Sequence, residues 1–394
     1  MKMEWIFTTH HCLNTAMNFL TPVVSGCFVM LVTFGGLSLF AGKAAAQSVD
    51  FRNLQPTVEA VRSTHKLPAL GAALVTSEGV QSLSTAGVRK RGDTTAVTND
   101  DLWHIGSDGK AMTATIIARL VERGTLKWTQ TLGETFPELA PQMKDDMKSV
   151  TMTQLLSHHA GFNANFDLMR YVNRKDLTAA RIDVLKEAMA KGLLSAPGSM
   201  FSYSNWGYTV ASAMAERASG KSFESLMRDE VFTPLEMKSA GFGGTGTLGK
   251  IDQPWPHTNN GKPTPSNGPE MDNPPVMAAA GGMHMSLADW AKFVREHLRG
   301  AQGKSTFLKQ ETFVKLHTPV GSDYALGWLT PQRGWAGGNT LHHGGDNTMN
   351  YALVWAAPAK DFAMLVVTNQ SGAQAPADEL VGAMLKAWLA REKK

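Results

Sequence analysis

The chain has 394 residues, a formal net charge of +4, 43% hydrophobic residues and 18% charged residues. A charge this close to balance argues against a strongly basic surface, so we expect no nucleic acid among the partners. Both cysteines, Cys12 and Cys27, lie near the start. The rest of the chain therefore has no disulfide and no thiolate metal ligand, and it is long enough for one large domain or two interleaved ones.

The first 46 residues have the features of an export leader. Residues 28–41 form an uncharged apolar run, and residues 44–46 read Ala-Ala-Ala, an Ala-x-Ala cleavage pattern. This arrangement is typical of a signal peptide, which predicts cleavage after Ala46 and a periplasmic or secreted protein. The mature domain would span residues 47–394.

Other interpretations of this leader remain open. Residues 17–42 carry no charge and are long enough to span a membrane, so membrane attachment is the alternative if the leader is not cleaved. The segment Val24-Ser25-Gly26-Cys27 resembles a lipoprotein box, although the apolar run continues beyond it. The true start could also be a later methionine such as Met17.

The mature chain begins with a predicted helix over residues 53–65 and a predicted hairpin of two strands, 69–76 and 80–88. A helix follows Ser107, since small and apolar residues recur there at helical spacing. Arg123 and Gly124 supply a basic last turn and a glycine suited to the left-handed conformation after a helix.

Helical patterns then dominate residues 129–240, and residues 241–275 are rich in Gly, Pro and Asn. The remaining predicted elements are a helix at 286–298 capped by Ser286, strands at 325–329, 339–342, 351–356 and 362–369, and a helix at 377–391. Strands thus occur only near the two ends. We predict an α/β (α+β) fold in which both ends build one antiparallel sheet, flanked by helices, with a mainly helical lobe inserted at about residues 129–275.

Ser107 and Lys110 form a Ser-x-x-Lys pattern at the start of the predicted helix. A serine hydroxyl needs an adjacent base to act as a nucleophile, and a lysine whose pKa is lowered by burial can be that base. Unpaired N–H groups at a helix start can also stabilise an oxyanion. A simple N-cap serine followed by an exposed lysine is the structural alternative for so short a pattern.

Two further stretches strengthen the functional interpretation. One is Tyr203-Ser204-Asn205, after Pro197-Gly198, and the other is His342-His343-Gly344-Gly345-Asp346. With Ser107-x-x-Lys110, they resemble the three motifs of the serine β-lactamase and penicillin-binding-protein superfamily. The similarity is to the branch that contains class C β-lactamases, D,D-carboxypeptidases, D-aminopeptidases and β-lactamase-like (family VIII) esterases, and it covers most of the mature chain.

The resemblance implies a role for each motif residue. Ser107 resembles the acylated nucleophile, Lys110 the lysine that activates it, Tyr203 the tyrosine that moves protons, and Asn205 the asparagine that holds the lysine and the substrate amide. A phenol has an ordinary pKa of about 10, so Tyr203 could act as a base near neutral pH only if cations such as Lys110 lowered that pKa. One oxyanion-hole N–H would come from Ser107 and the other from the third motif.

The third motif fits the family in two registers. His343 with Gly345 is the register that we favour, and it assigns the second oxyanion N–H to Asp346. In the other register, His342 pairs with Gly344 and the N–H belongs to Gly345. Many relatives have lysine at this histidine position. Because an ordinary histidine is mostly neutral at pH 7, we expect weaker attraction for a substrate carboxylate and a pH dependence of activity near 6.5.

The sequence therefore predicts an exported serine hydrolase that forms an acyl-enzyme with an ester, amide or β-lactam carbonyl. Its partner would be a small-molecule or peptide substrate, with cell-wall peptides as one class. A non-hydrolytic penicillin- or peptide-binding module on the same fold is the alternative function. We predict no cofactor and no metal, since the adjacent histidine pairs 158–159 and 342–343 point in diverging directions on a helix or strand.

Overall fold

The structure is a computed structural model that describes residues 50–391. The predicted leader, with its cleavage pattern and both cysteines, lies outside the described residues. Residues 50–391 belong to one compact unit. Across this part of the chain, no helix has the length and apolar character needed to cross a membrane.

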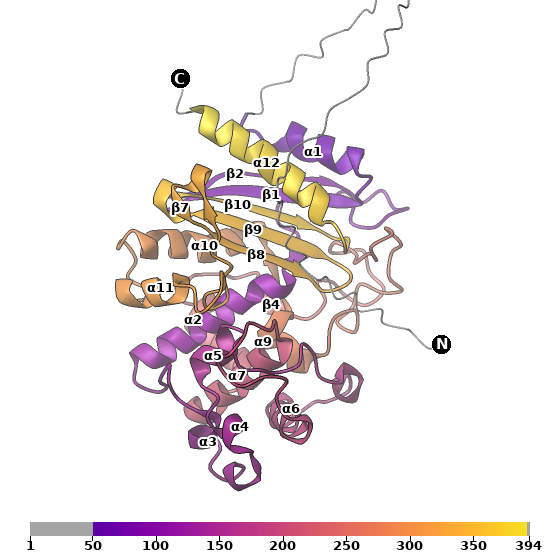
Figure 1. The fold of residues 1–394 in the computed structure, drawn as a ribbon. Coiled ribbons are helices and arrows are strands. Elements are labelled where there is room, and N and C mark those ends of the chain that lie inside the picture. Colours follow the sequence, from indigo (N-terminus) through magenta and orange to yellow (C-terminus); the bar gives the residue numbers. More distant parts are fainter. Residues whose placement is uncertain (1–49, 392–394) are drawn as a thin grey trace, which may run out of the picture. The chain divides into compact units, whose positions relative to one another are not determined.

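A five-stranded antiparallel sheet is built from both ends of the chain, as predicted (Figure 1). Its order is β2-β1-β10-β9-β8. The central strand β10 pairs with β1 in a register that sets Leu70 opposite Thr368. The strands span β1 Ala69–Thr76, β2 Gly79–Gly87, β8 Leu341–Asp346, β9 Tyr351–Ala357 and β10 Phe362–Thr368.

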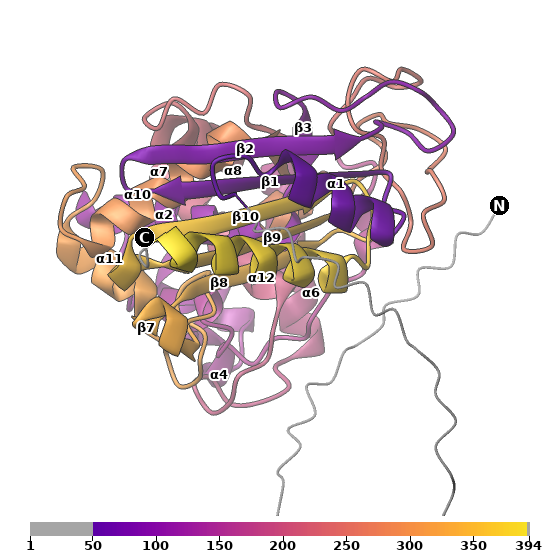
Figure 2. The same cartoon turned by 90° about the horizontal axis from the view of Figure 1, so that it is seen from above.

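Helices cover both faces of this sheet, which is why β1 and β10 consist of continuous apolar runs that are buried at every residue. The terminal helices α1 (Gln55–Thr64) and α12 (Gln374–Ala390) lie over one face (Figure 2). Helix α10 (Leu287–Ala301) contacts β1, β2 and β10 on the other. Alternate side chains of β1 therefore join two separate hydrophobic cores.

The helices between β3 and α10 lie on the α10 side of the sheet (Figure 1). Helix α2 (Gly109–Glu122) is the long element at their centre, and Ser286 caps α10 as predicted. The others are α3 Leu132–Thr135, α4 Asp145–Lys148, α5 Met152–Leu156, α6 Leu177–Lys191, α7 Asn205–Ser219, α8 Phe223–Met227 and α9 Ala278–Gly281, with α11 Gln310–His317 after α10.

The remaining strands are short and form two small sheets apart from the main one. Strands β3 (Leu102–His104), β5 (Met283–Ser286) and β4 (Gly241–Phe242) form a small three-stranded sheet. Strands β6 (Gln332–Arg333) and β7 (Gly338–Asn339) form a two-stranded ribbon. The small sheet was not predicted, because strands of two to four residues carry too little periodicity to be recognised.

Two strand predictions require correction. Residues 325–329 form no strand, and Tyr324 and Leu329 make only isolated bridges. Gly327 has φ +83°, and a Cβ there would lie 2.6 Å from the Cα of Ala111, so the segment turns against α2. The strand predicted at 339–342 instead begins at Leu341 and continues to Asp346.

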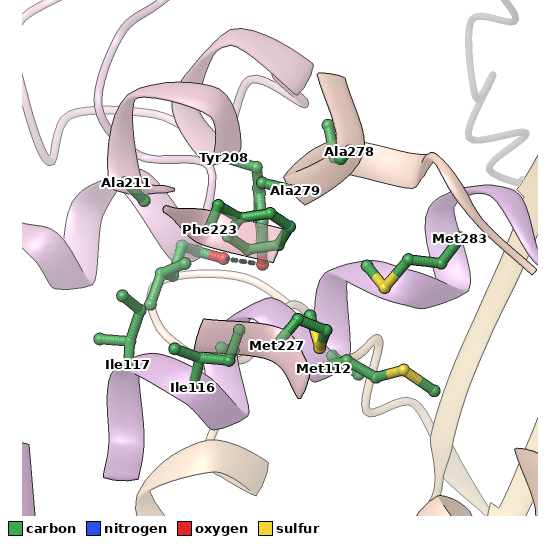
Figure 3. Close-up of a cluster of buried hydrophobic side chains, with 14 of the residues drawn as sticks. Met112, Ile116, Ile117, Tyr208, Ala211, Phe223, Met227, Ala278, Ala279 and Met283 are labelled. Atoms are coloured by element: carbon green, nitrogen blue, oxygen red, sulfur yellow. Dashed lines mark hydrogen bonds between the residues drawn. The ribbon is translucent and has the colours of Figure 1, made fainter. Parts of the chain in front are cut away.

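Helix α2 packs against a cluster of buried, mainly apolar side chains (Figure 3). Met112 and Ile116 of α2 pack among Phe223 and Met227 of α8 and Tyr208 of α7. All five are buried, and the Tyr208 hydroxyl donates to the carbonyl of Leu156 over 2.6 Å. A closely packed cluster of this kind holds α2 in one position, and with it Lys110 in the first turn of the helix and Ser107 just before it.

Candidate active site

Ser107 lies in a single 3₁₀ turn, Gly106–Asp108, that leads directly into α2. This is the predicted place, at the start of the helix, where backbone N–H groups have no intrahelical partner. Gly106 has φ +51°, and a Cβ there would lie 2.8 Å from the carbonyl carbon of Gly345. Glycine is therefore required before Ser107 by conformation and by space.

The Lys110 side chain is completely buried, and its amine contacts three oxygens. Lys110 Nζ lies 2.9 Å from Ser107 Oγ, 2.8 Å from Asn205 Oδ1 and 2.5 Å from the carbonyl oxygen of Ala280. Burial lowers the pKa of Lys110 well below its ordinary value, although the nearby Asp108 acts in the opposite direction. The amine is thus poised to be neutral beside the serine hydroxyl.

Tyr203 reaches this amine from the turn before α7. Lys110 Nζ lies 4.9 Å from the centre of the Tyr203 ring. Burial raises the pKa of Tyr203, while a hydrogen bond with Ser107 partly opposes this effect. The condition under which Tyr203 could act as a base, a pKa lowered by cations, is therefore not met, because burial dominates and Lys110 is itself buried and favours its neutral form.

The rest of the second motif fixes Tyr203 and Asn205 in place. Ser204 caps α7, since its Oγ accepts from the N–H of Gly207 over 3.0 Å. Its own N–H donates to Nδ1 of His158 over 3.0 Å, and the His158 ring packs on Tyr203 with centres 4.3 Å apart. His158 therefore contacts the second motif directly, through both its hydrogen bond and its ring.

Asn205 uses both ends of its amide within the protein. Its Oδ1 accepts from Lys110, and its Nδ2 donates to Oδ1 of Asn165 over 2.7 Å. The structure therefore contains the contact by which Asn205 holds Lys110. Asn165 was not identified from sequence, since it lies in an irregular segment with no pattern of its own.

The third motif lies on β8, where neighbouring side chains point to opposite faces. His343 is buried on the face toward Tyr203, with ring centres 6.4 Å apart. His342 instead stacks on Trp355 at 3.7 Å. The geometry thus matches the register that pairs His343 with Gly345.

Both ring nitrogens of His343 have partners. Its Nδ1 donates to the carbonyl of Gly344 over 2.9 Å, and its Nε2 accepts from the hydroxyl of Tyr324 over 3.1 Å. Burial lowers the pKa of His343 to about 3, with Lys110 contributing. The expectation of a histidine titrating near pH 6.5 is therefore wrong, because the ring is desolvated. Tyr324 itself was missed as a site residue.

Gly345 brings the third motif against the nucleophile turn. A Cβ on Gly345 would lie 2.0 Å from the carbonyl oxygen of Ile105 and 2.8 Å from the backbone nitrogen of Ser107. The side chain of Asp346 points elsewhere: its carboxylate accepts from Ser371 Oγ and from the N–H of Gly372, each over 2.8 Å. Only the backbone of Asp346 remains available to the site.

Asp108 is a further buried group that sequence analysis did not assign to the site. Neither of its carboxyl oxygens has a hydrogen-bond partner among the residues that the structure describes. Burial raises its pKa well above the ordinary value, and Lys110 opposes this only in part. A poor helix former between Ser107 and Lys110 was the only signal in the sequence.

Within residues 50–391, no group of three or more His, Cys, Asp or Glu side chains is placed to hold a metal ion. Both adjacent histidine pairs diverge. His158 packs on Tyr203, whereas the ring of its neighbour His159 turns its Nδ1 to the carbonyl of Ser157 over 2.8 Å.

Known proteins share this architecture. Penicillin-binding protein 4 of Amycolatopsis lactamdurans is 28% identical over 251 residues, which cover 63% of this chain and 64% of that protein. The chain spans less than two thirds of the length of the curated relatives it matches.

Two solved structures have a similar fold. One is an octameric penicillin-binding protein homologue from Pyrococcus abyssi, with a TM-score of 0.68 and 20% identity over 86% of this chain and 76% of that one. The other is the D-alanine carboxypeptidase AmpC from Burkholderia cenocepacia, with a TM-score of 0.68 and 19% identity over 85% and 97%. The β-lactamase family model matches residues 54–387, nearly all of the described unit, and the chain therefore belongs to the β-lactamase family.

Proposed function

We propose that this protein is a serine hydrolase that forms an acyl-enzyme on Ser107. The observation that carries the proposal is the contact of 2.9 Å between Ser107 Oγ and the buried amine of Lys110. A neutral amine has two N–H donors and one lone pair. Asn205 Oδ1 and the carbonyl of Ala280 accept the two N–H groups, so the lone pair faces Ser107. Lysine is then the base that the serine requires.

In the first half of the reaction, the Ser107 hydroxyl gives its proton to Lys110 while Oγ attacks the substrate carbonyl. The developing oxyanion accepts hydrogen bonds from the N–H groups of Ser107 and Asp346, whose segments lie in close contact at Gly106 and Gly345. The tetrahedral intermediate then expels the alcohol, amine or opened-ring nitrogen of the substrate, which leaves the acyl group on Oγ.

Tyr203 stays protonated in this scheme because burial raises its pKa. Its hydroxyl, next to Ser107, gives a proton to the leaving group and regains one from Lys110. In the second half, water attacks the acyl carbonyl and gives a proton to Lys110. That proton then passes to Ser107 Oγ as the acyl–oxygen bond breaks, which releases the acid and restores the serine hydroxyl and the neutral amine. The carbonyl of an ester, an amide or a β-lactam can follow this route. The relatives' names include a penicillin-binding protein and a D-alanine carboxypeptidase, which supports small-molecule or peptide substrates.

The test compares wild type with Ser107→Ala on a chromogenic cephalosporin, nitrophenyl esters of short and medium acyl chains, and D-alanine nitroanilide. We expect turnover of at least one of them that the variant lacks. A fluorophosphonate probe should label wild type once per chain, and mass spectrometry should place the label on the peptide containing Ser107. Full activity in Ser107→Ala would refute the mechanism. Labelling without turnover of any substrate would favour the binding-module alternative.

We also propose that the enzyme acts after export. The support is the apolar run of residues 28–41 followed by the Ala-Ala-Ala pattern ending at Ala46. Every site residue lies beyond Ala46, so cleavage would leave the proposed site complete. N-terminal sequencing of the protein recovered from the periplasm or medium should begin at Gln47. A product that retains the leader and sediments with membranes would contradict cleavage and favour the anchor.

A further inference from the structure

Three buried polar side chains behind the candidate site play no part in the proposed chemistry. They are His104 at the end of β3, Asp272 in the irregular segment before α9, and Asn347 directly after β8. The side chains of His104 and Asp272 are 1% and 2% exposed, and Asn347 is 2% exposed. Burying a carboxylate is costly unless it is well hydrogen-bonded, so this arrangement calls for an explanation.

The three side chains form one continuous hydrogen-bonded bridge. The backbone N–H of Gly106 donates to Nδ1 of His104 over 3.1 Å. His104 Nε2 lies 3.1 Å from the Asp272 carboxylate, and Asn347 Nδ2 donates to Asp272 Oδ1 over 3.0 Å. Because Nδ1 accepts, the ring proton sits on Nε2 and is donated to Asp272.

The two ends of the bridge attach to the two segments that supply the proposed oxyanion donors. Gly106 immediately precedes Ser107, and Asn347 immediately follows Asp346. The two segments touch directly, since a Cβ on Gly106 would lie 3.0 Å from the backbone nitrogen of Asp346. Asn347 also fixes its own turn, because its Oδ1 accepts from the N–H of Asn350 over 2.8 Å.

We propose that His104 and Asp272 are positioning residues that set the separation of the two oxyanion donors, by tying the Gly106 peptide to the Asn347 turn. This inference rests on the proposed function. Nothing covalent links the nucleophile turn to β8, and the close approach of Gly106 and Gly345 has no side chains to lock it. The bridge supplies that link through its hydrogen bonds to Gly106 at one end and from Asn347 at the other.

A change in the separation of the two oxyanion donors weakens stabilisation of the transition state more than it weakens substrate binding. Removal of one oxyanion donor costs about 10²–10³-fold in kcat, and a displacement of about 1 Å costs on the order of 10²-fold. Loosening the bridge should therefore lower kcat with little change in KM. A role in stability alone would lower the thermal midpoint and leave kcat of the folded enzyme unchanged.

Three variants each break a different part of the bridge. In His104→Asn, Oδ1 replaces Nδ1 as acceptor for Gly106 while the link to Asp272 is lost. In His104→Gln, the amide replaces Nε2 and keeps the link to Asp272, but the Gly106 N–H loses its acceptor. In Asp272→Asn, one oxygen is left for two donors. The matched control is His284→Asn, because His284 pairs with His104 across β3 and β5 but donates to the carbonyl of Gly243 over 2.8 Å, outside the bridge.

The measurements are kcat and KM on the substrate that wild type hydrolyses, and affinity for a boronic acid, which mimics the tetrahedral intermediate. For the bridge variants we expect kcat to fall about 10–100-fold, KM to change less than threefold, and boronic acid affinity to fall in parallel with kcat. His284→Asn should stay within about twofold of wild type in kcat and boronic acid affinity.

The outcomes separate the two proposals. If wild type hydrolyses its substrate and the bridge variants match His284→Asn in kcat and boronic acid affinity, the positioning role is refuted and the proposed function stands. Losses in KM alone would also refute it. If wild type neither turns over a substrate nor accepts the fluorophosphonate probe, the proposed function itself fails and this inference fails with it. Because each His104 variant keeps one of the two links, both are expected to fold.

Discussion

The hydroxyl of Tyr324 donates a hydrogen bond to Nε2 of His343 over 3.1 Å, and it thereby occupies the only nitrogen of that ring able to accept a proton. The Nδ1 proton is committed to the carbonyl of Gly344. The third-motif residue is consequently a neutral, fixed hydrogen-bonding group. It differs in this respect from a lysine, which would place a cation at the same point.

The first prediction concerns the pH profile. Since the pKa of His343 is lowered to about 3, the ring stays neutral across the working range and contributes no inflection near pH 6.5. We expect His343→Gln to leave the midpoint of the acid limb of kcat/KM within about 0.3 pH units of wild type. A limb that moves by a full unit would show that His343 titrates during the reaction.

A second prediction distinguishes a base from a cation at Lys110. Arginine keeps the charge but does not release its proton, so Lys110→Arg should lose about 10²–10⁴-fold in kcat/KM. Lys110→Met, whose side chain is no larger than that of lysine, should lose as much in kcat/KM. The matched control is Lys292→Arg, on the surface beside Asp289, which should retain full activity. If Lys110→Arg keeps more than a tenth of the activity, a positive charge suffices and the base is elsewhere.

A third prediction tests the neutral state of Asp108. An ionised Asp108 would raise the pKa of Lys110, so removing it would move the acid limb of kcat/KM to lower pH. Because burial favours the protonated carboxyl, we expect Asp108→Asn to leave the limb in place and to change kcat/KM by less than about threefold. A shift of one unit or more toward acid would mean that Asp108 and Lys110 form an ion pair in the free enzyme.

The fourth prediction concerns close packing at Gly345. Its Cβ would overlap the carbonyl oxygen of Ile105, so Gly345→Ala must push β8 away from Ser107. We expect a loss of about 1–3 kcal/mol in the free energy of unfolding and at least about 10²-fold in kcat. Urea denaturation and steady-state kinetics measure the two effects.

The control for Gly345 is Gly382→Ala in α12. A Cβ at Gly382 meets nothing within 4 Å. Alanine should therefore stabilise this helix by about 0.5–1 kcal/mol and leave kcat unchanged. Equal kcat in Gly345→Ala and wild type would show that the approach of β8 to Ser107 does not set the rate.

The fifth prediction concerns stability in acid. Burial lowers the pKa of seven histidines, which are His158, His257, His284, His297, His317, His342 and His343. Below an unfolded pKa of about 6.5, the unfolded chain binds protons that the folded chain does not. The free energy of unfolding must therefore decrease as the pH falls from about 6.5 toward 4, by up to about 1.4 kcal/mol per pH unit for each histidine.

One member of this set permits a direct check. Nε2 of His317 lies 2.8 Å from Nδ1 of His297, and burial lowers the pKa of His317 to about 3. In His317→Gln, the slope of unfolding free energy against pH between 4.5 and 6 should decrease by about 1.4 kcal/mol per unit. Urea titrations at each pH give the slope. An unchanged slope would mean that this ring is already protonated in the fold.

The sequence by itself determined the fold class and the motif residues of the candidate site, but not Asp108, Asn165 or Tyr324. Alternating and continuous apolar residues predicted the sheet strands at both ends. A strand buried on one face alternates apolar and polar residues, and a strand buried on both faces is apolar throughout. Ser107 and Lys110 were recognisable because residues three apart on a helix are neighbours. Tyr203, Asn205 and His343 were found by the order of short motifs.

The tertiary structure decided the protonation states and the contacts between distant segments. Burial lowers the pKa of Lys110 and raises that of Tyr203, and this could not be predicted from the sequence because desolvation depends on atoms from several elements and not on local sequence. The turn at Gly327 exists because α2 lies against it, and the bridge from His104 to Asn347 joins residues more than 200 positions apart. Local patterns record which residues are buried, and only the folded chain fixes what each buried group faces.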